Sequence, residues 1–292
     1  MKDKDVLQRF LFENAPVRGG VVHLNQSYQT IIQQHGYPMV ICHILGEALA
    51  AVSLLSSIIK FKGRLTLQFR GKGKLKLLVA QCNQQFQLRA LAQWDGELTQ
   101  EEVLDSLHQG VLAIMVDPEI PGGNPYQGIV AWQGRSLAES IEAYFNQSEQ
   151  LDTRIWLSVN ETCAAGLLLQ VMPQEKPELF KNDWEHLTTL TQTLTEDELL
   201  QLDHADLLYR LYSQEDVRLF EQLPVVFHCD CSIARGEQAV LLLGQEEAEQ
   251  ELNEKQNLIV TCEFCNTEFI FDRVDVARIF KHGENPSSTQ VH

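Results

Sequence analysis

The hydrophobic positions in the N-terminal part of the chain alternate between the period of strands and the period of helices. Residues 21–24 predict a strand, residues 27–35 a helix, and residues 39–60 a long buried helix. The period then changes to two, and glycines and lysines at 71–74 turn the chain into a second strand. Residues 65–80 therefore predict a β-hairpin.

Pairs of a threonine or serine with a glutamate three residues later predict the starts of further helices. In such a capping box, each side chain bonds the amide of the other residue. The boxes lie at Thr99 with Glu102, Ser136 with Glu139, and Thr195 with Glu198. Strand-like segments occupy residues 111–116, 128–132, 155–159 and 167–171. Hairpins mixed with helices predict the fold class α+β, and we place this N-terminal domain at residues 1–180.

The composition changes between residues 174 and 222, which contain twelve acids and four bases but no glycine or cysteine. Trp184, Leu187 and Leu190 recur there at helical spacing. Residues 181–222 therefore predict an acidic linker of short amphipathic helices between two domains. A helical subdomain packed permanently on the N-terminal domain has the same pattern, so both interpretations stay open.

Residues 223–292 predict a small C-terminal domain that ends in a disordered tail from about residue 284. The whole chain has 40 acids and 23 bases, and this net charge of -17 disfavours general binding of nucleic acid. The N-terminus mixes both charges and has no continuous apolar run, so we expect a cytoplasmic protein without a secretory signal.

One apolar stretch, residues 39–59, approaches the length of a membrane span. It contains His43, Glu47 and three serines, and polar side chains of this kind are costly in hydrocarbon. We therefore expect a buried core helix and no membrane partner.

Four of the seven cysteines form two close pairs, Cys229 with Cys231 and Cys262 with Cys265. Thirty residues separate the pairs, which is compatible with a tetrahedral zinc site because each pair can occupy one edge of the tetrahedron. Four thiolates fill the coordination sphere and leave no position for a water. The pattern therefore predicts one structural zinc ion and no hydrolytic enzyme.

Other interpretations of these cysteines are weaker. A thioredoxin-type Cys262-x-x-Cys265 should lie at the N-terminus of a helix. The flanking residues instead predict two strands joined by a knuckle. Static disulfides conflict with the expected compartment, and four core cysteines conflict with the polar residues beside them. His228 could replace a thiol ligand, but an outward-facing strand residue is the better interpretation. We interpret the isolated Cys42, Cys82 and Cys163 as buried structural residues.

Several short motifs along the chain resemble those of the redox-regulated 33-kilodalton heat-shock chaperone family, also called the 33-kilodalton chaperonin. The resemblance spans roughly residues 7–275. The matching motifs are Val17-Arg18-Gly19, Tyr126-Gln127-Gly128-Ile129-Val130, Tyr144-Phe145, Ser148-Glu149-Gln150-Leu151, Ala164-Ala165-Gly166, Gln170-Val171-Met172-Pro173, Cys229-x-Cys231-Ser232 and Cys262-x-x-Cys265. One departure is Arg89-Ala90, where family members usually have Arg-Gly.

The resemblance implies an ATP-independent holdase whose four cysteines bind zinc in a reduced, inactive state. Oxidation would then pair Cys229 with Cys231 and Cys262 with Cys265, release the zinc, and unfold the zinc domain and the linker. The N-terminal domain would bind clients and form a homodimer. Clients would be unfolding, aggregation-prone proteins that pass later to ATP-dependent chaperones.

The acidic linker has a candidate docking surface in the sequence. Residues 48–94 contain eight bases and no acid, with the bases concentrated around residues 60–76. We expect the linker to dock on this basic hairpin through Trp184, Leu187 and Leu190 in the reduced state. Two competing functions remain. One is a thiol-disulfide oxidoreductase using Cys262 and Cys265, and the other is an anion or nucleic-acid binder, disfavoured because base-stacking aromatics are nearly absent, that would use Arg64, Arg70, Lys72, Lys74 and Lys76.

Overall fold

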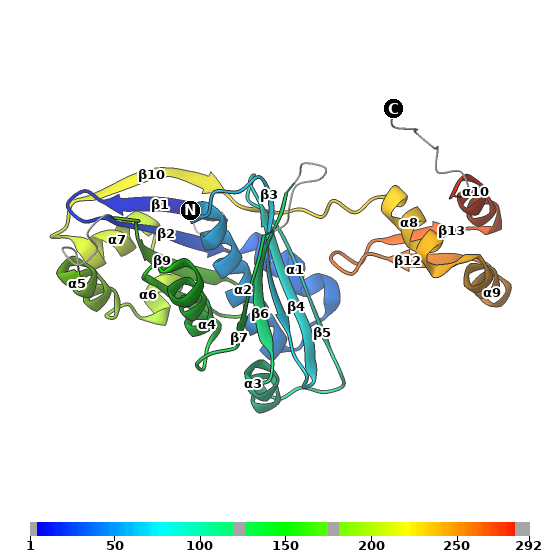
Figure 1. The fold of residues 1–292 in the computed structure, drawn as a ribbon, viewed down its shortest axis with the longest axis horizontal. Coiled ribbons are helices and arrows are strands. Elements are labelled where there is room, and N and C mark those ends of the chain that lie inside the picture. Colours follow the sequence, from blue (N-terminus) through cyan, green and yellow to red (C-terminus); the bar gives the residue numbers. More distant parts are fainter. Residues whose placement is uncertain (1–4, 119–125, 175–180, 284–292) are drawn as a thin grey trace. The chain divides into compact units, whose positions relative to one another are not determined.

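A computed structural model describes residues 5–118, 126–174 and 181–283 of the protein (Figure 1). The chain divides into two compact units, Met1–His228 and Cys229–His292. The helices of the first unit are α1 (Gln26–His35), α2 (Met39–Ile58), α3 (Gln100–His108), α4 (Leu137–Tyr144), the π-helix η1 (Phe145–Glu149), α5 (Lys181–Thr191), α6 (Glu196–Gln201) and α7 (His204–Tyr212).

Two sheets form the framework of the first unit. The five-stranded sheet has the order β10-β1-β2-β9-β8, and the six-stranded sheet has the order β11-β5-β4-β3-β6-β7. Their strands are β1 (Val6–Phe12), β2 (Val17–Leu24), β3 (Gly63–Arg70), β4 (Leu75–Asn83), β5 (Gln87–Trp94), β6 (Val111–Pro118), β7 (Tyr126–Ala131), β8 (Thr153–Val159), β9 (Ala164–Val171), β10 (Val217–Pro224) and β11 (Val226–Phe227). Helices combined with mostly antiparallel sheets confirm the α+β class.

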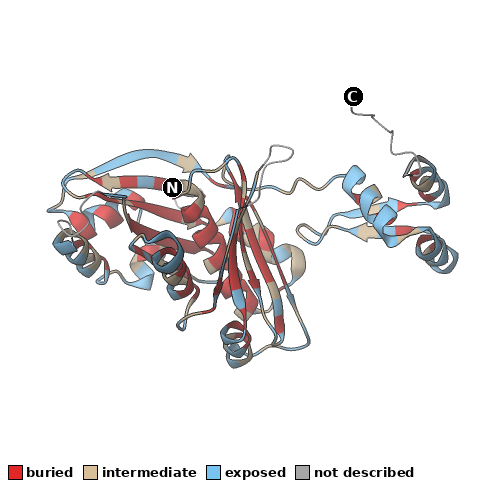
Figure 2. Cartoon of the chain, in the orientation of Figure 1, coloured by how far each residue is buried: buried red, intermediate tan, exposed pale blue. Residues whose placement is uncertain are grey.

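The apolar helix α2 lies in the core of this unit and contacts strands of both sheets. Figure 2 shows it buried over most of its length. Gly46 makes the close approach possible, because a Cβ there would lie 2.8 Å from the Val159 side chain and 2.9 Å from Tyr28. The hydrophobicity of residues 39–58 is thus explained by contact with two sheets, as expected from the sequence.

The predicted hairpin is confirmed as β3 and β4, which pair antiparallel with Phe69 opposite Leu78. The capping boxes at Thr99 and Thr195 are also present. At Ser136 only the hydroxyl makes its half of the box, because Glu139 accepts a hydrogen bond from the amide of Arg135. Ala90 is fully buried in β5 with an ordinary backbone conformation, so alanine fits at this position.

Residues 181–222, here called the linker segment, form α5, α6 and α7 and then most of strand β10. The helices agree with the sequence pattern, but the strand does not. β10 pairs antiparallel with β1, placing Val217 opposite Phe12 and Pro224 opposite Val6. Its side chains are mostly exposed because it is an edge strand, and it therefore lacks the alternation of a half-buried strand.

The second unit contains a small α+β arrangement around its own core. Its elements are α8 (Ile233–Leu243), α9 (Gln245–Lys255), β12 (Leu258–Thr261), β13 (Glu268–Phe271) and α10 (Arg273–Gly283). In the described part of this unit, seven buried side chains form the core: Val240, Ala248, Leu252, Leu258, Phe271, Val276 and Ile279. The tail that the sequence predicts to be disordered, from residue 284, lies outside the described residues.

Candidate metal centre and linker contacts

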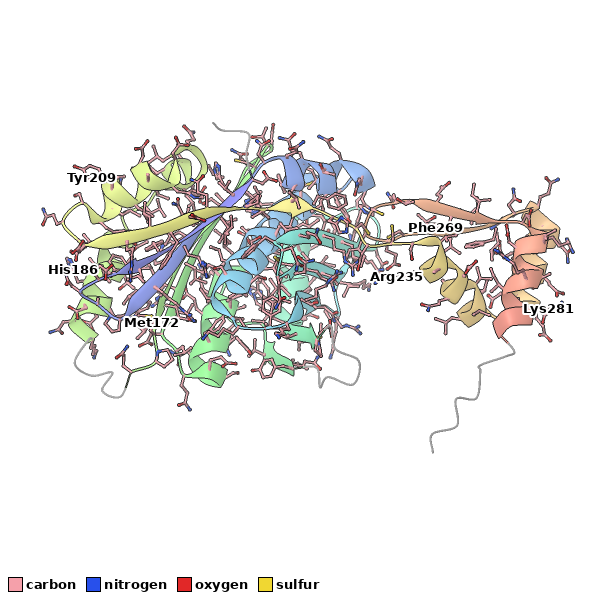
Figure 3. The ribbon with its side chains drawn as sticks, turned by 90° about the horizontal axis from the view of Figure 1, so that it is seen from above. Met172, His186, Tyr209, Arg235, Phe269 and Lys281 are labelled. Carbon is pink, nitrogen blue, oxygen red and sulfur yellow. The ribbon has the colours of Figure 1, made fainter. Side chains whose placement is uncertain are left out.

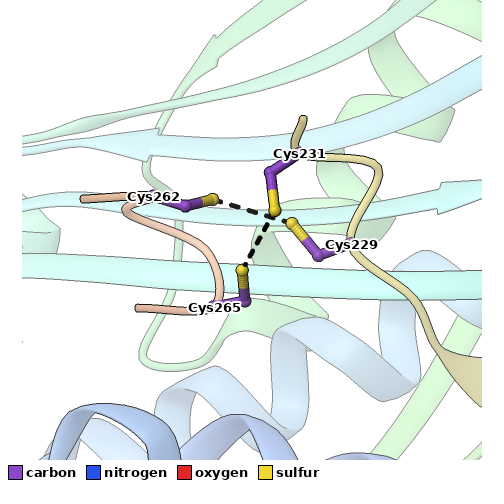
Figure 4. Close-up of side chains that lie close together, drawn as sticks. All are labelled: Cys229, Cys231, Cys262 and Cys265. Atoms are coloured by element: carbon purple, nitrogen blue, oxygen red, sulfur yellow. Dashed lines mark hydrogen bonds between the residues drawn. The ribbon is translucent and has the colours of Figure 1, made fainter. Parts of the chain in front are cut away.

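The side chains of Cys229, Cys231, Cys262 and Cys265 converge on one point of the second unit (Figure 4). All four sulfurs lie within 4.8 Å of one another. The Sγ atoms of Cys229 and Cys262 are 3.7 Å apart, and those of Cys231 and Cys265 are 3.4 Å apart. Tetrahedral coordination with zinc–sulfur bonds of about 2.3 Å separates the sulfurs by roughly 3.8 Å, so the arrangement fits zinc.

A tight turn between two strands presents the second cysteine pair. β12 and β13 are antiparallel, and Thr261 pairs with Glu268 at the end of the ladder. Within the turn, the amides of Cys265 and Asn266 both donate to the carbonyl of Cys262. Asn266 adopts a positive φ of 53°, which asparagine tolerates better than most residues. The structure is therefore strand, knuckle, strand, as expected.

The first cysteine pair lies immediately before α8. Ser232 caps this helix by accepting a hydrogen bond from the amide of Arg235. Arg235 lies on α8 (Figure 3), and its guanidinium pairs with Asp230, between the two cysteines, at 3.2 Å. The cap and the ion pair restrain the loop that carries Cys229 and Cys231.

The pKa values of Cys229, Cys231 and Cys265 are shifted in different directions. Burial, with smaller effects of Cys265 and Cys262, raises the pKa of Cys229 to about 12 against an opposing backbone hydrogen bond of Cys231, and burial also raises the pKa of Cys231. Burial opposes ionisation of Cys265 as well, but hydrogen bonds from Thr267 and from the other thiols lower its pKa to about 7. Four thiolates this close together repel one another, and a divalent cation would compensate that charge.

The cluster does not have the geometry of a thioredoxin-type dithiol. Cys262 and Cys265 lie in a turn between strands, so no helix N-terminus stabilises a thiolate there. His228 is exposed, its amide donates to the carbonyl of Leu88, and its ring is not in the group of ligands. Cys42, Cys82 and Cys163 are buried elsewhere, and burial raises the pKa of each thiol.

The linker segment packs its apolar side chains on the outer face of the five-stranded sheet. Leu187 is 1% exposed there, and Trp184 and Leu190 are partly buried beside it. The sheet contributes Phe10, Phe12, Val17, Val21, Ala165, Leu167 and Leu169. Tyr212 of α7 contacts Phe12 edge to face with ring centroids 5.0 Å apart, and its hydroxyl lies 2.5 Å from that of Thr191.

The expectation that the linker segment docks on the basic hairpin is therefore wrong. Lysines of the hairpin already have partners in their own unit, since Lys74 pairs with Glu102 at 2.6 Å and Lys76 with Asp95 at 3.1 Å. Apolar burial on the five-stranded sheet decides the position of the helices, because an exposed ion pair contributes little.

Sequence reasoning missed a buried histidine between the linker segment and the sheet. His204 of α7 is 4% exposed, and neither of its ring nitrogens has a hydrogen-bond partner among the described residues. Its ring lies edge to face with that of His23 on β2, at 6.4 Å between centroids, and His23 contacts the carbonyl of Leu200 at 2.7 Å. A single histidine on an amphipathic helix has no spacing signal that would reveal this position.

Acid should weaken the docking of these helices. Burial, with a smaller effect of His23 that exceeds the opposing effect of Asp203, lowers the pKa of His204 to about 4. Because the docked pKa is below the ordinary value, docking has its full stability above about pH 6.5 and loses stability as pH falls toward 4. Between pH 7.5 and 5 the loss should be about 2 kcal/mol. Hydrogen exchange of the α6 and α7 amides measures it.

The matched control for this acid effect is the exposed His108 on α3. His204→Leu should abolish most of the pH dependence, whereas His108→Gln should keep it. Acid would also protonate any thiolates of the cysteine cluster, but both variants share that effect, so the difference between them reports on His204 alone. Equal pH dependence in the two variants would show that His204 does not control docking.

The fold and the thiol cluster define an α+β protein with a separate four-cysteine unit that could hold a metal ion. A family model described as Hsp33 protein matches residues 5–272. A 33 kDa chaperonin of Nitrosococcus oceani is 46% identical over 280 residues, which cover 96% of each chain. That of Pseudomonas aeruginosa is 44% identical over 298 aligned positions, covering 99% of this chain and 100% of the relative.

The crystal structure of a 33 kDa chaperonin, the heat shock protein 33 homolog of Thermotoga maritima, has the same fold. It matches 97% of this chain and 99% of its own with a TM-score of 0.83 and 22% sequence identity. The chain belongs to the Hsp33 family, and its function is that of a chaperone.

Proposed function

We propose that this protein is a redox-regulated, ATP-independent holdase of the cytoplasm that is inactive while reduced and bound to one zinc ion. The convergence of four cysteine sulfurs within 4.8 Å, in a chain of a chaperone family, carries this proposal. Zinc, when bound, would join the loop that carries Cys229 and Cys231 to the turn that carries Cys262 and Cys265. The protein would act by binding and not as an enzyme.

Oxidation would convert the thiols to disulfides. We propose the pairing implied by the family resemblance, Cys229 with Cys231 and Cys262 with Cys265. Each pair of zinc-bound thiolates would lose two electrons to a peroxide, which takes up two protons from the solvent and is reduced to two waters, so both disulfides need two equivalents of peroxide. A disulfide sulfur is a poor zinc ligand, and the metal would therefore leave.

Loss of zinc would expose the client surface through the linker segment. The seven-residue core of the second unit is too small to stabilise it well alone. Its unfolding would leave the chain after β11 without folded structure and favour undocking of α5, α6 and α7. The apolar face of the five-stranded sheet, with Phe10, Phe12 and Leu167 fully buried under these helices, would then become accessible.

The partners follow from this surface. Unfolding proteins expose apolar segments that would bind the uncovered sheet face and be kept from aggregating. The same face would support a homodimer of the oxidised chain, and bound clients would be transferred to ATP-dependent chaperones when reducing conditions return.

A thiol-disulfide oxidoreductase remains the second candidate, because the pKa of Cys265 near 7 makes a thiolate accessible at neutral pH. The two functions differ in turnover. An oxidoreductase would reduce insulin steadily in the presence of a dithiol, whereas a holdase would not.

An aggregation assay tests the proposal directly. The reduced, zinc-loaded chain should leave the aggregation of a thermally unfolding client unchanged, while the peroxide-treated chain should suppress it at near-stoichiometric ratios. Zinc release and the loss of four free thiols should accompany activation. Equal suppression by both forms, or activation with all four thiols still reduced, would contradict redox regulation.

A further inference from the structure

A cavity of about 450 Å³ opens in the first unit between α2, α3 and the start of α4. Ligand-binding cavities fall in this range of volume. Its wall is mainly apolar and includes Val40, Ile44, Val103, Leu104, Leu107 and Trp132. Met39 lies at the cavity with 60% of its surface exposed, and a flexible thioether adapts to ligands of different shape. This α2–α3 cavity is separate from the cysteine cluster.

Charged groups in the cavity are distributed unevenly. Glu47 lines it from α2 with a largely buried side chain, and its nearest ionic partner is His43 at 3.9 Å. Glu196, the first residue of α6, lies close enough to act on both of them. Within the described ranges, no lysine or arginine pairs with either glutamate. Arg135 lines the cavity without pairing with Glu47.

The Glu47 carboxylate is therefore destabilised. Burial, followed by the charge of Glu196, raises the pKa of Glu47 to about 7. A cation from a ligand would relieve both effects, since it would replace lost hydration and oppose the neighbouring negative charge. The cavity thus combines an apolar wall with a carboxylate that lacks a strong cationic partner.

We propose that the α2–α3 cavity is a client subsite that accepts one bulky apolar side chain from an extended segment, with an adjacent lysine or arginine paired to Glu47. This inference rests on the proposed holdase function and adds a sequence preference to it. Glu196 also connects the subsite to the proposed activation by oxidation. It lies on α6, which belongs to the linker segment that would undock. Undocking of α6 would remove the negative charge of Glu196 from the neighbourhood of Glu47 and His43.

Binding of labelled ten-residue peptides to the oxidised full-length chain tests the subsite. The reference peptide carries a central Phe-Lys in a Gly-Ser background, and two others replace the Phe with Ala or the Lys with norleucine. Leu104→Trp should fill the cavity and weaken binding of the reference peptide about tenfold. Glu47→Gln should remove a preference for Lys over norleucine that we expect to be about fivefold. Glu101→Gln, on the exposed side of α3, is the matched control and should change neither.

Several outcomes would overturn the inference. A tryptophan at Leu104 also tests the packing of α3, so the circular dichroism and zinc content of Leu104→Trp are compared with wild type, and Glu47→Gln gives an independent readout. Wild-type affinity in a folded Leu104→Trp variant, or an unchanged lysine preference in Glu47→Gln, would contradict the subsite. A change in sedimentation of Leu104→Trp without a change in peptide affinity would assign the cavity to a second copy of the chain. Failure of the holdase function differs from these, because oxidised wild-type chain would then not suppress aggregation.

Discussion

Cys229→Ser is expected to reduce the zinc content from one ion per chain to a small fraction and to unfold most of residues 229–283. Serine is a poor zinc ligand, and a structural zinc site contributes on the order of 10 to 16 kcal/mol at neutral pH. This matches or exceeds the net stability of an ordinary domain, about 5 to 15 kcal/mol. Metal analysis measures the zinc, and hydrogen exchange of the α8–α10 amides measures the unfolding.

Cys163→Ser is the matched control for this substitution. It changes the same atom in a buried cysteine of the first unit, outside the cluster, and should leave one zinc per chain. The Cys229 variant should also suppress client aggregation without oxidant if zinc loss alone activates the chaperone. One full equivalent of zinc in Cys229→Ser would disprove four-thiolate coordination.

The cysteine cluster could be predicted from the sequence because the spacing within each cysteine pair is a local feature of the chain. Two residues between Cys262 and Cys265 fit a single turn, and the strands on both sides of this turn are short and apolar enough to recognise. The capping boxes at Thr99 and Thr195 were predictable for the same reason, since each depends on contacts over three residues.

Contacts between distant parts of the chain were not predictable in the same way. β10 pairs with β1 across more than 200 residues, and its exposed edge position removes the alternation that identifies a strand. Charge suggested the wrong docking surface for the linker segment, because the sequence does not show that Lys74 and Lys76 have nearby acidic partners. Apolar spacing still identified Leu187 as a buried residue of that segment.

Two interpretations of α5, α6 and α7 are open: a linker whose undocking activates the chaperone, and a helical subdomain that stays packed on the sheet. Replacing Trp184 and Leu187 with glutamine should weaken docking by about 2 to 5 kcal/mol, because Leu187 is buried against the five-stranded sheet and Trp184 packs beside it. The second unit keeps its own core and cysteine cluster in this variant. We therefore expect a chaperone that is partly active while reduced and still contains about one zinc per chain.

Three measurements on the reduced variant decide between the two interpretations. Hydrophobic-dye binding should rise, aggregation of a model client should fall without oxidant, and zinc content should remain near one per chain. Tyr209→Gln is the matched control, because Tyr209 lies on α7 with 75% of its surface exposed (Figure 3) and its loss should leave docking intact. A folded Trp184/Leu187 variant that keeps its zinc and stays inactive until oxidised would show that these helices are ordinary core. Redox regulation would then act through the metal site without undocking of these helices, because uncovering the sheet face would not be sufficient for client binding.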